Sequence, residues 1–309
     1  MIVKYISGVN QKEFILNQNY EIAIKECNPY DVAWSYDAIE NQCGVTIKKF
    51  KKDPISLEFV FKFRGSMKTI RQNLDAFFRE AETDIYHMLA GKVYIGTEYL
   101  EGYFIERKTE PTQEFYGFQQ TALFFAPYPF WVREIQYSFL AEAADPITIL
   151  PGEEEPEPEI TMEQGIMLPE FPFDLTVKEG KKTKGIFDLP TDLKRVRGTR
   201  MIDNESYLPC HFRMTIYGPV TDPEIVIANH IYKVETTVFT DERLVIDSRS
   251  NTVIKIGRLG EETDLYNSRY KLQSVFEKIP PGQQTVTWPG GYGIDITLYD
   301  ERSEPRWTL

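Results

Sequence analysis

The sequence predicts a mainly β protein in which one α-helix packs on the first of two β domains. Short stretches of alternating apolar and polar residues, bounded by turn residues, recur along most of the chain, and only one stretch has helical spacing. A proline-rich acidic segment interrupts this pattern near the middle. Because 309 residues are enough to bury two cores, we expect a first domain over 1–140 and a second over 171–309.

The first domain is predicted to begin with strands. Residues 55–63 place apolar side chains at alternate positions, with Val60 as the exception, which is typical of a strand with one buried face. Residues 20–26 and 44–50 are predicted as shorter strands. A hairpin over about 92–107 and a strand over 115–125 follow the helix.

The single helix is predicted over about 66–82. Ser66 follows a glycine, and its hydroxyl oxygen can accept a hydrogen bond from an unpaired backbone amide at the helix start. The apolar residues that recur at helical spacing are Ile70, Leu74, Phe77, Phe78, Ala81 and Ile85. We expect this face to pack on a sheet.

The stretch 121–139 combines two prolines with a dense aromatic cluster. Pro127 and Pro129 remove backbone donors, so neither a helix nor a central strand can run unbroken through 127–129. We therefore predict that one buried strand ends here and another begins. Pro129, Phe130 and Trp131 are expected to form a packed corner between them, and the first domain is expected to end near residue 140.

The formal net charge of −12 is concentrated in one segment. Residues 141–174 hold ten acidic residues and no lysine or arginine, and without them 37 acids remain against 35 bases. Residues 141–170 are predicted to be an extended or mobile acidic linker or insertion, because their glutamates repel and their prolines are scattered. The basic run over 178–200 is either a solvated loop or the partner of the acidic segment across a domain or subunit boundary.

Several classes of protein are disfavoured by composition. No apolar run approaches the roughly 18 residues of a membrane span, so no membrane insertion is expected. The N-terminus lacks the pattern of a signal peptide. Cys27, Cys43 and Cys210 are widely spaced, which favours free thiols in a reducing cytosol. The basic run lacks interleaved aromatic residues, so no specific nucleic-acid binding is expected.

The second half is predicted to be an antiparallel β-sandwich. Alternating apolar residues mark a strand over 211–217, and a tight turn at Asn229 and His230 separates two further strands. Other strand pairs are predicted over 244–256 and 284–299. Short strands separated by turn residues at roughly 8 to 12 residue spacing are typical of sandwiches.

The sequence predicts no catalytic, metal or cofactor site. His87, His211 and His230 are not placed with cysteines or carboxylates at metal-ligand spacing. Asp295 and Asp300 are available as a carboxylate pair, but they show no acid/base asymmetry. Trp288 and Tyr292 flank a Pro-Gly-Gly turn, and they either belong to the sandwich core or form an exposed platform on which a glycan stacks.

Taken in order, these segments resemble siphophage distal tail proteins, the ring components at the tip of long non-contractile tails. The matching segments are Trp34-Ser35-Tyr36 with 44–50, the strand over 55–63 with Arg64-Gly65, the hairpin VYIGTEYLEGYFIERK, the Pro-Phe-Trp corner, Phe171-Pro172-Phe173-Asp174, SYLPCHFRMTIYGPVTDPEIVI and IPPGQQTVTW. Each is a motif of packing residues, and their order and spacing carry the resemblance, which covers most of the chain.

The resemblance implies a tail-tube-like N-terminal domain and a galectin-like C-terminal sandwich. It implies a homo-hexameric ring without catalytic residues, placed at the virion tail tip after synthesis in the bacterial cytoplasm. Its implied partners are the tail tube protein, the tape-measure protein, the tail-associated hub or lysin protein, and a receptor-binding protein or host surface glycan. DNA would pass through such a ring. The acidic segment 141–170 is longer than the connection that the family implies.

Two other functions stay open at this stage. A non-catalytic carbohydrate-binding protein would need an exposed aromatic platform around Trp288 and Tyr292. A glycoside hydrolase would need a cleft with two carboxylates, for which Asp295 is the residue to replace.

Overall fold

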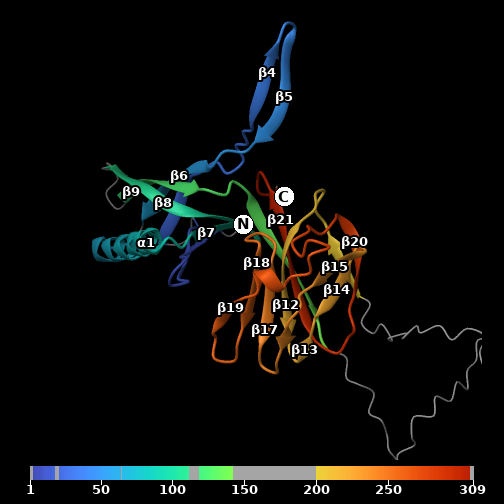
Figure 1. The fold of residues 1–309 in the computed structure, drawn as a ribbon. Helices are drawn as coiled ribbons and strands as arrows, with labels where there is room; N and C mark the ends of the chain where they lie inside the picture. Colours follow the sequence, from blue (N-terminus) through green and yellow to red (C-terminus); the bar gives the residue numbers. More distant parts are fainter. Residues whose placement is uncertain (1–2, 18–20, 64, 111–117, 142–199, 307–309) are drawn as a thin grey trace, which may run out of the picture.

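A computed structural model describes residues 3–17, 21–63, 65–110, 118–141 and 200–306. Within these residues the chain is mainly β, with strands β1 to β21, one long α-helix and one short 3-10 helix, η1. Figure 1 shows the two halves side by side, with one β-hairpin projecting from the first half. The structure confirms the predicted fold class.

The core of the first half lies between the helix α1 (Met67–His87) and an antiparallel sheet. In this sheet β6 (Ile55–Phe63) pairs with β3 (Ile22–Glu26) on one side and β9 (Phe118–Ala126) on the other, and β9 pairs with β8 (Glu98–Glu110). Aromatic side chains from α1 and three of these strands fill the space between them, namely Phe59, Phe61, Phe77, Phe104 and Phe124.

Helix α1 begins where the sequence predicts and ends later. The Ser66 hydroxyl accepts a hydrogen bond from the Thr69 amide at 3.2 Å, as expected of a cap. The helix runs on to His87 and ends at Met88, which is left-handed with φ 55°. The prediction that Ile85 faces the core is wrong: its side chain is 42% exposed, because the last turn extends past the sheet-facing core.

The predicted hairpin after the helix is present and lies inside a sheet. Strand β7 (Gly91–Ile95) pairs with β8 on one side and with β1 (Val3–Ile6) on the other, and β1 pairs with β2 (Glu13–Ile15). β1 covers the β7 edge of the hairpin and β9 covers its β8 edge. β8 runs to Glu110, beyond its predicted end.

Strand β10 (Trp131–Phe139) joins the two halves. As predicted, β9 ends at Ala126 and a new strand begins at Trp131. β10 pairs along its full length with β21 (Ile294–Arg302), and through Val132 and Tyr99 it also pairs with β8. One sheet therefore runs from the second half into the first. The proposed boundary near residue 140 falls just after β10, and apart from Ala141 the acidic segment 141–170 lies outside the described residues.

The second half is a sandwich of two antiparallel sheets. The first contains β19 (Glu262–Asp264), β18 (Thr252–Ile256), β17 (Arg243–Asp247), β12 (His211–Tyr217), β21 and β10. The second contains β11 (Arg200–Asn204), β20 (Gly282–Thr287), β14 (Glu224–Ile227) and β15 (His230–Lys233). The smaller elements are β13 (Val220–Thr221), its partner β16 (Thr237–Val238), and η1 (Tyr266–Ser268). Phe212 of one sheet meets Tyr232 of the other, with ring centroids 5.2 Å apart.

One predicted turn is displaced by a residue. The turn between β14 and β15 is formed by Ala228 and Asn229, both with positive φ, and His230 already belongs to β15. This conformation is that of a two-residue hairpin turn, in which both central residues are left-handed.

Candidate interaction surface at the projecting hairpin

Strands β4 (Ser35–Asn41) and β5 (Gly44–Lys51) form a hairpin that projects beyond the rest of the molecule (Figure 1). Among the described residues the two strands pair only with each other, through a turn at Gln42 and Cys43. Every residue of both strands is exposed except Ser35, which is half-buried. Within the part of the chain that the structure describes, this hairpin has no core of its own.

The two faces of this hairpin differ in polarity. Cross-strand partners share a face, alternate pairs lie on the same side, and a β-bulge near Asp37 adds one residue to β5. One face therefore carries an apolar stripe that consists of Tyr36, Ala38, Val45, Ile47 and Phe50. Glu40, the partner of Val45, lies at the far end of this stripe. The Tyr36 and Phe50 rings lie 6.4 Å apart between centroids, and both side chains are more than half exposed.

The opposite face is mostly polar, with Ile39 as its apolar exception. Lys51 forms an ion pair with Asp37, and Asn41 Nδ2 donates to Thr46 Oγ1 over 2.6 Å. An isolated two-stranded hairpin is only marginally stable in water. A contiguous exposed apolar surface marks an interaction site. The apolar stripe is therefore the candidate functional surface of the first half.

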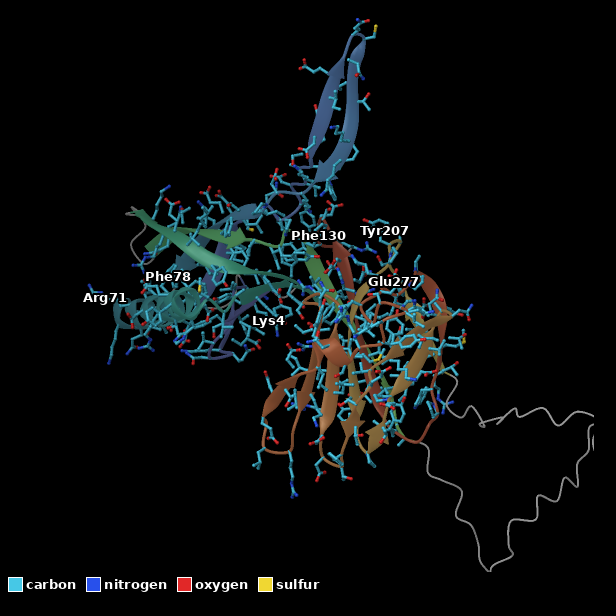
Figure 2. All side chains as sticks on the ribbon, viewed as in Figure 1. Lys4, Arg71, Phe78, Phe130, Tyr207 and Glu277 are labelled. Atoms are coloured by element: carbon cyan, nitrogen blue, oxygen red, sulfur yellow. The ribbon has the colours of Figure 1, made fainter. Side chains whose placement is uncertain are left out.

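The base of the hairpin is anchored by a cation and two rings. Lys52 Nζ lies 4.8 Å from the ring centroid of Phe130 and 5.8 Å from that of Trp34, and it donates to the Ser303 carbonyl oxygen at 3.1 Å. Burial lowers the pKa of Lys52 to about 8, although Glu304 opposes the shift. Phe130 lies where the hairpin meets the body (Figure 2).

The predicted corner thus connects three distant segments. Pro129 and Trp131 are buried, and Trp131 belongs to the core of the first half. Phe130 contacts the hairpin base on one side and the Tyr128 ring, 5.2 Å away, on the other. The Tyr128 hydroxyl donates to Glu301 of β21 over 2.8 Å. The corner therefore links the hairpin to β21, the partner of the strand β10 that joins the two halves.

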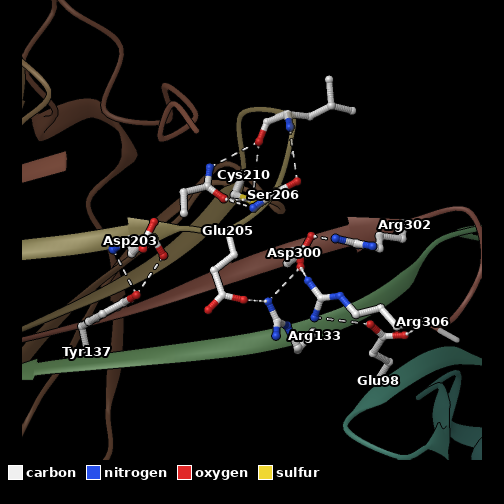
Figure 3. A network of polar contacts seen from close by, with 12 residues as sticks. Glu98, Arg133, Tyr137, Asp203, Glu205, Ser206, Cys210, Asp300, Arg302 and Arg306 are labelled. Carbon is white, nitrogen blue, oxygen red and sulfur yellow. Dashed lines mark hydrogen bonds and ion pairs between the residues drawn. The ribbon is translucent and has the colours of Figure 1, made fainter. Parts of the chain in front are cut away.

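A network of charges around the buried Asp300 and Glu98 holds the two halves together (Figure 3). Asp300 of β21 is 1% exposed and accepts hydrogen bonds from Arg133 of β10 and from Arg306. The Arg306 amide donates to Glu98 of β8 over 2.7 Å. Arg133 also donates to Glu205, and this hydrogen bond lowers the pKa of the Glu205 carboxyl.

A second group of charges lies beside the first. Arg249 of the second half bridges Glu101 and Glu301, at 3.3 and 3.4 Å. Lys92 in turn lies 3.6 Å from Glu101. Because removing one partner of a buried pair leaves the other charge uncompensated, both groups favour one fixed arrangement of the halves.

The glycan-stacking candidates do not form a platform. Trp288 and Tyr292 are 2% and 4% exposed and belong to the core of the sandwich. Trp288 Nε1 donates to the Tyr292 carbonyl oxygen over 3.0 Å, and the Tyr292 hydroxyl donates to the Glu224 carbonyl oxygen over 2.9 Å. Their burial contradicts the exposed platform, because no ring face is left for a sugar.

The two carboxylates considered for glycoside hydrolysis are not a pair. Asp295 and Asp300 lie five residues apart on the regular strand β21, so they point to opposite faces and are separated by about 17 Å along it. Asp295 accepts a hydrogen bond from the Tyr217 hydroxyl, whereas Asp300 is held by arginines. Among the described residues no group of histidines, cysteines and carboxylates could hold a metal ion.

A search for membrane spans gives no candidate: in the described part of the chain, no helix is both long and apolar enough to cross a bilayer.

Sequence reasoning missed the features that matter most at this surface. The pairing of Lys52 with Phe130, and of Asp300 with Arg133, joins residues far apart in the chain and leaves no local signal. The sequence carries only a weak signal for the hairpin. Tyr36, Ala38 and Glu40 stand at alternate positions, as in a strand, and the glycine of Cys43-Gly44 follows them, as in a turn.

Comparison with known proteins gives matches at the level of structure. No protein-family model and no curated protein sequence matches this chain. The SPP1 Dit (gp 19.1) protein, described as a paradigm of the hub adsorption apparatus in phages that infect Gram-positive bacteria, has a similar fold, with a TM-score of 0.56 at 8% identity. The match covers 98% of this chain and 100% of that one.

Chains of the phage P2 baseplate in its activated conformation are also similar. The form with Ca matches with a TM-score of 0.56 at 12% identity, over 99% of this chain and 100% of that one. The form with Sr matches with a TM-score of 0.56 at 11% identity, over 98% and 99%. This chain thus shares its fold, over nearly its whole length, with phage hub and baseplate proteins.

Proposed function

We propose that this chain is a structural protein of a long non-contractile phage tail. Six copies would form a ring at the tail tip that joins the tail tube to the baseplate hub and the receptor-binding parts. The observation that carries the proposal is the extent of the fold match, which includes both halves in one alignment and leaves almost none of the baseplate chains uncovered.

The hairpin gives this proposal a physical basis. A ring subunit needs surfaces that are exposed in the monomer and buried in the assembly, and the apolar stripe meets the first condition. The buried charges at the junction supply a rigid subunit, because they fix the two halves in one arrangement. In this proposal the first half forms the ring and contacts the tail tube, tape-measure and hub proteins, and the sandwich faces outward.

The first test is the assembly state of the purified full-length chain. Light scattering should give about 216 kDa, the mass of six copies of the 36.0 kDa chain, and negative-stain images should show sixfold rings with an open centre. Immunogold labelling of virions that contain the chain should mark the distal end of the tail. A protein that stays monomeric at every concentration, or a label elsewhere on the virion, contradicts the proposal.

The channel of the ring provides a second test. Phosphates bind basic surfaces strongly, so a channel that conducts DNA should present few lysine or arginine side chains. A cryo-EM map of the ring would identify the residues that line it. A channel lined by basic residues would count against a role in DNA passage.

A further inference from the structure

The exposed apolar residues of the first half fall into two groups. One is the apolar stripe with its flanking residues, and the other is the end of α1, here called the helix-end patch, which consists of Ile85, Tyr86, Met88 and Leu89. Tyr86 and Met88 are 84% and 82% exposed. Ile105 and Leu140 are the other large exposed apolar residues among those described in this half, and they are isolated.

The helix-end patch has a fixed backbone. The Met88 amide donates to the Ile85 carbonyl at 3.1 Å, and the Leu89 amide donates to the Asp84 carbonyl at 3.0 Å. The Asp84 carboxylate is buried and accepts hydrogen bonds from the amides of Gly8 and Val9, both at 2.9 Å. These bonds tie the last turn of α1 to the turn after β1. A surface that is ordered before binding loses less conformational entropy when a partner arrives.

Charges around the two groups are complementary. Lys48 is exposed on β5 and directly follows Ile47 of the apolar stripe, whereas Lys49 pairs with Asp37 on the opposite face. The helix-end patch lies at the negative end of the α1 dipole and follows the exposed Glu82. The hairpin points away from α1 in Figure 1, so the two groups belong to separate parts of the first half.

We propose that the apolar stripe of one copy binds the helix-end patch of a second copy. This inference rests on the proposed ring and names its interface. Each copy then contributes its apolar stripe to one neighbour and its helix-end patch to the other. This head-to-tail arrangement closes a ring when the rotation between successive copies permits. Burial of the Tyr36 and Phe50 rings against Tyr86 and Met88 supplies the apolar contact, and Lys48 approaches the negative end of the α1 dipole.

The test uses one variant for each surface. Ile47→Asp places a charge in the apolar stripe, and Met88→Glu places one in the helix-end patch. Each should weaken self-association by about 30-fold or more and leave the protein monomeric. Because both positions are exposed, thermal unfolding of the variant monomers should match that of wild type diluted until it is monomeric. Leu259→Glu is the control, since Leu259 is exposed on the second half and should leave assembly unchanged.

Mixing the two variants tests the head-to-tail arrangement directly. An equal mixture retains one intact stripe and one intact patch, so it should form dimers and no rings by analytical ultracentrifugation. A mixture that stays monomeric overturns the proposed pairing. Rings that survive Met88→Glu also overturn it but leave the proposed function standing. Open polymers or dimers that need both surfaces would support the interface and contradict the closed ring instead.

Discussion

Two hairpins of the first half, β7–β8 and β4–β5, have opposite surroundings. β7–β8 is enclosed by strands on both sides, and Val93 and Leu100 are fully buried. Among the described strands β4–β5 pairs only with itself, and its apolar stripe is exposed. Apolar residues stabilise a fold only where the chain supplies a neighbour to cover them. The second hairpin therefore contributes little to the stability of the monomer and is available to a partner.

The largest effect should come from truncating one apolar side chain in each hairpin. Leu100→Ala removes fully buried atoms and should lower the free energy of unfolding by about 2–5 kcal/mol. Ile47→Ala removes exposed atoms and should change it by less than about 0.5 kcal/mol. Urea unfolding of both variants, at a protein concentration where the chain is monomeric, gives the comparison. Equal losses would mean that the projecting hairpin packs against the body in solution.

The same contrast explains what the sequence could predict. Residues 55–63 and 211–217 alternate in their own sequence, and the Ser66 cap and the corner at Pro129 act through the local backbone, so each was predictable. The stripe was hidden because the bulge shifts the alternation between Ile47 and Phe50. The pairing of β10 with β21 joins distant segments, and no local pattern specifies such contacts.

Replacing one glycine in each hairpin should distinguish the effect of steric crowding, at Gly102, from that of backbone strain, at Gly44. A Cβ added at Gly102 of β8 would lie 2.3 Å from the Phe125 carbonyl oxygen, so Gly102→Ala must displace backbone and should cost about 1–3 kcal/mol of unfolding free energy. Gly44 of β5 has φ +126° and open space around it. Gly44→Ala is strained only locally.

Two measurements distinguish these outcomes. Urea unfolding should detect the Gly102 variant and leave the Gly44 variant close to the wild type, within about 0.5 kcal/mol. Hydrogen exchange should instead show faster exchange of the β4–β5 amides in the Gly44 variant, because local opening of this hairpin does not require unfolding of the body. A large global loss in the Gly44 variant would show that the two hairpins are energetically coupled.

The smallest effect concerns Lys52, where the exposed hairpin joins the buried body. Burial lowers the pKa of this amine to about 8 in the folded chain, whereas the unfolded chain titrates near 10.5. Between these values the unfolded state binds more protons, so the stability contributed by Lys52 rises with pH across this window. Lys52→Met keeps the length of the side chain and its packing on Phe130 but removes the titration.

The difference in unfolding free energy, wild type minus Lys52→Met, should therefore increase between pH 7 and pH 9.5. Above about pH 10 both proteins lose stability, since burial raises the pKa of the Tyr128 phenol and the unfolded chain then loses protons first, but this loss is common to both and cancels in the difference. A difference that stays flat below pH 9.5 would show that Lys52 is solvated, and that the base of the projecting hairpin is as open to water as its tip.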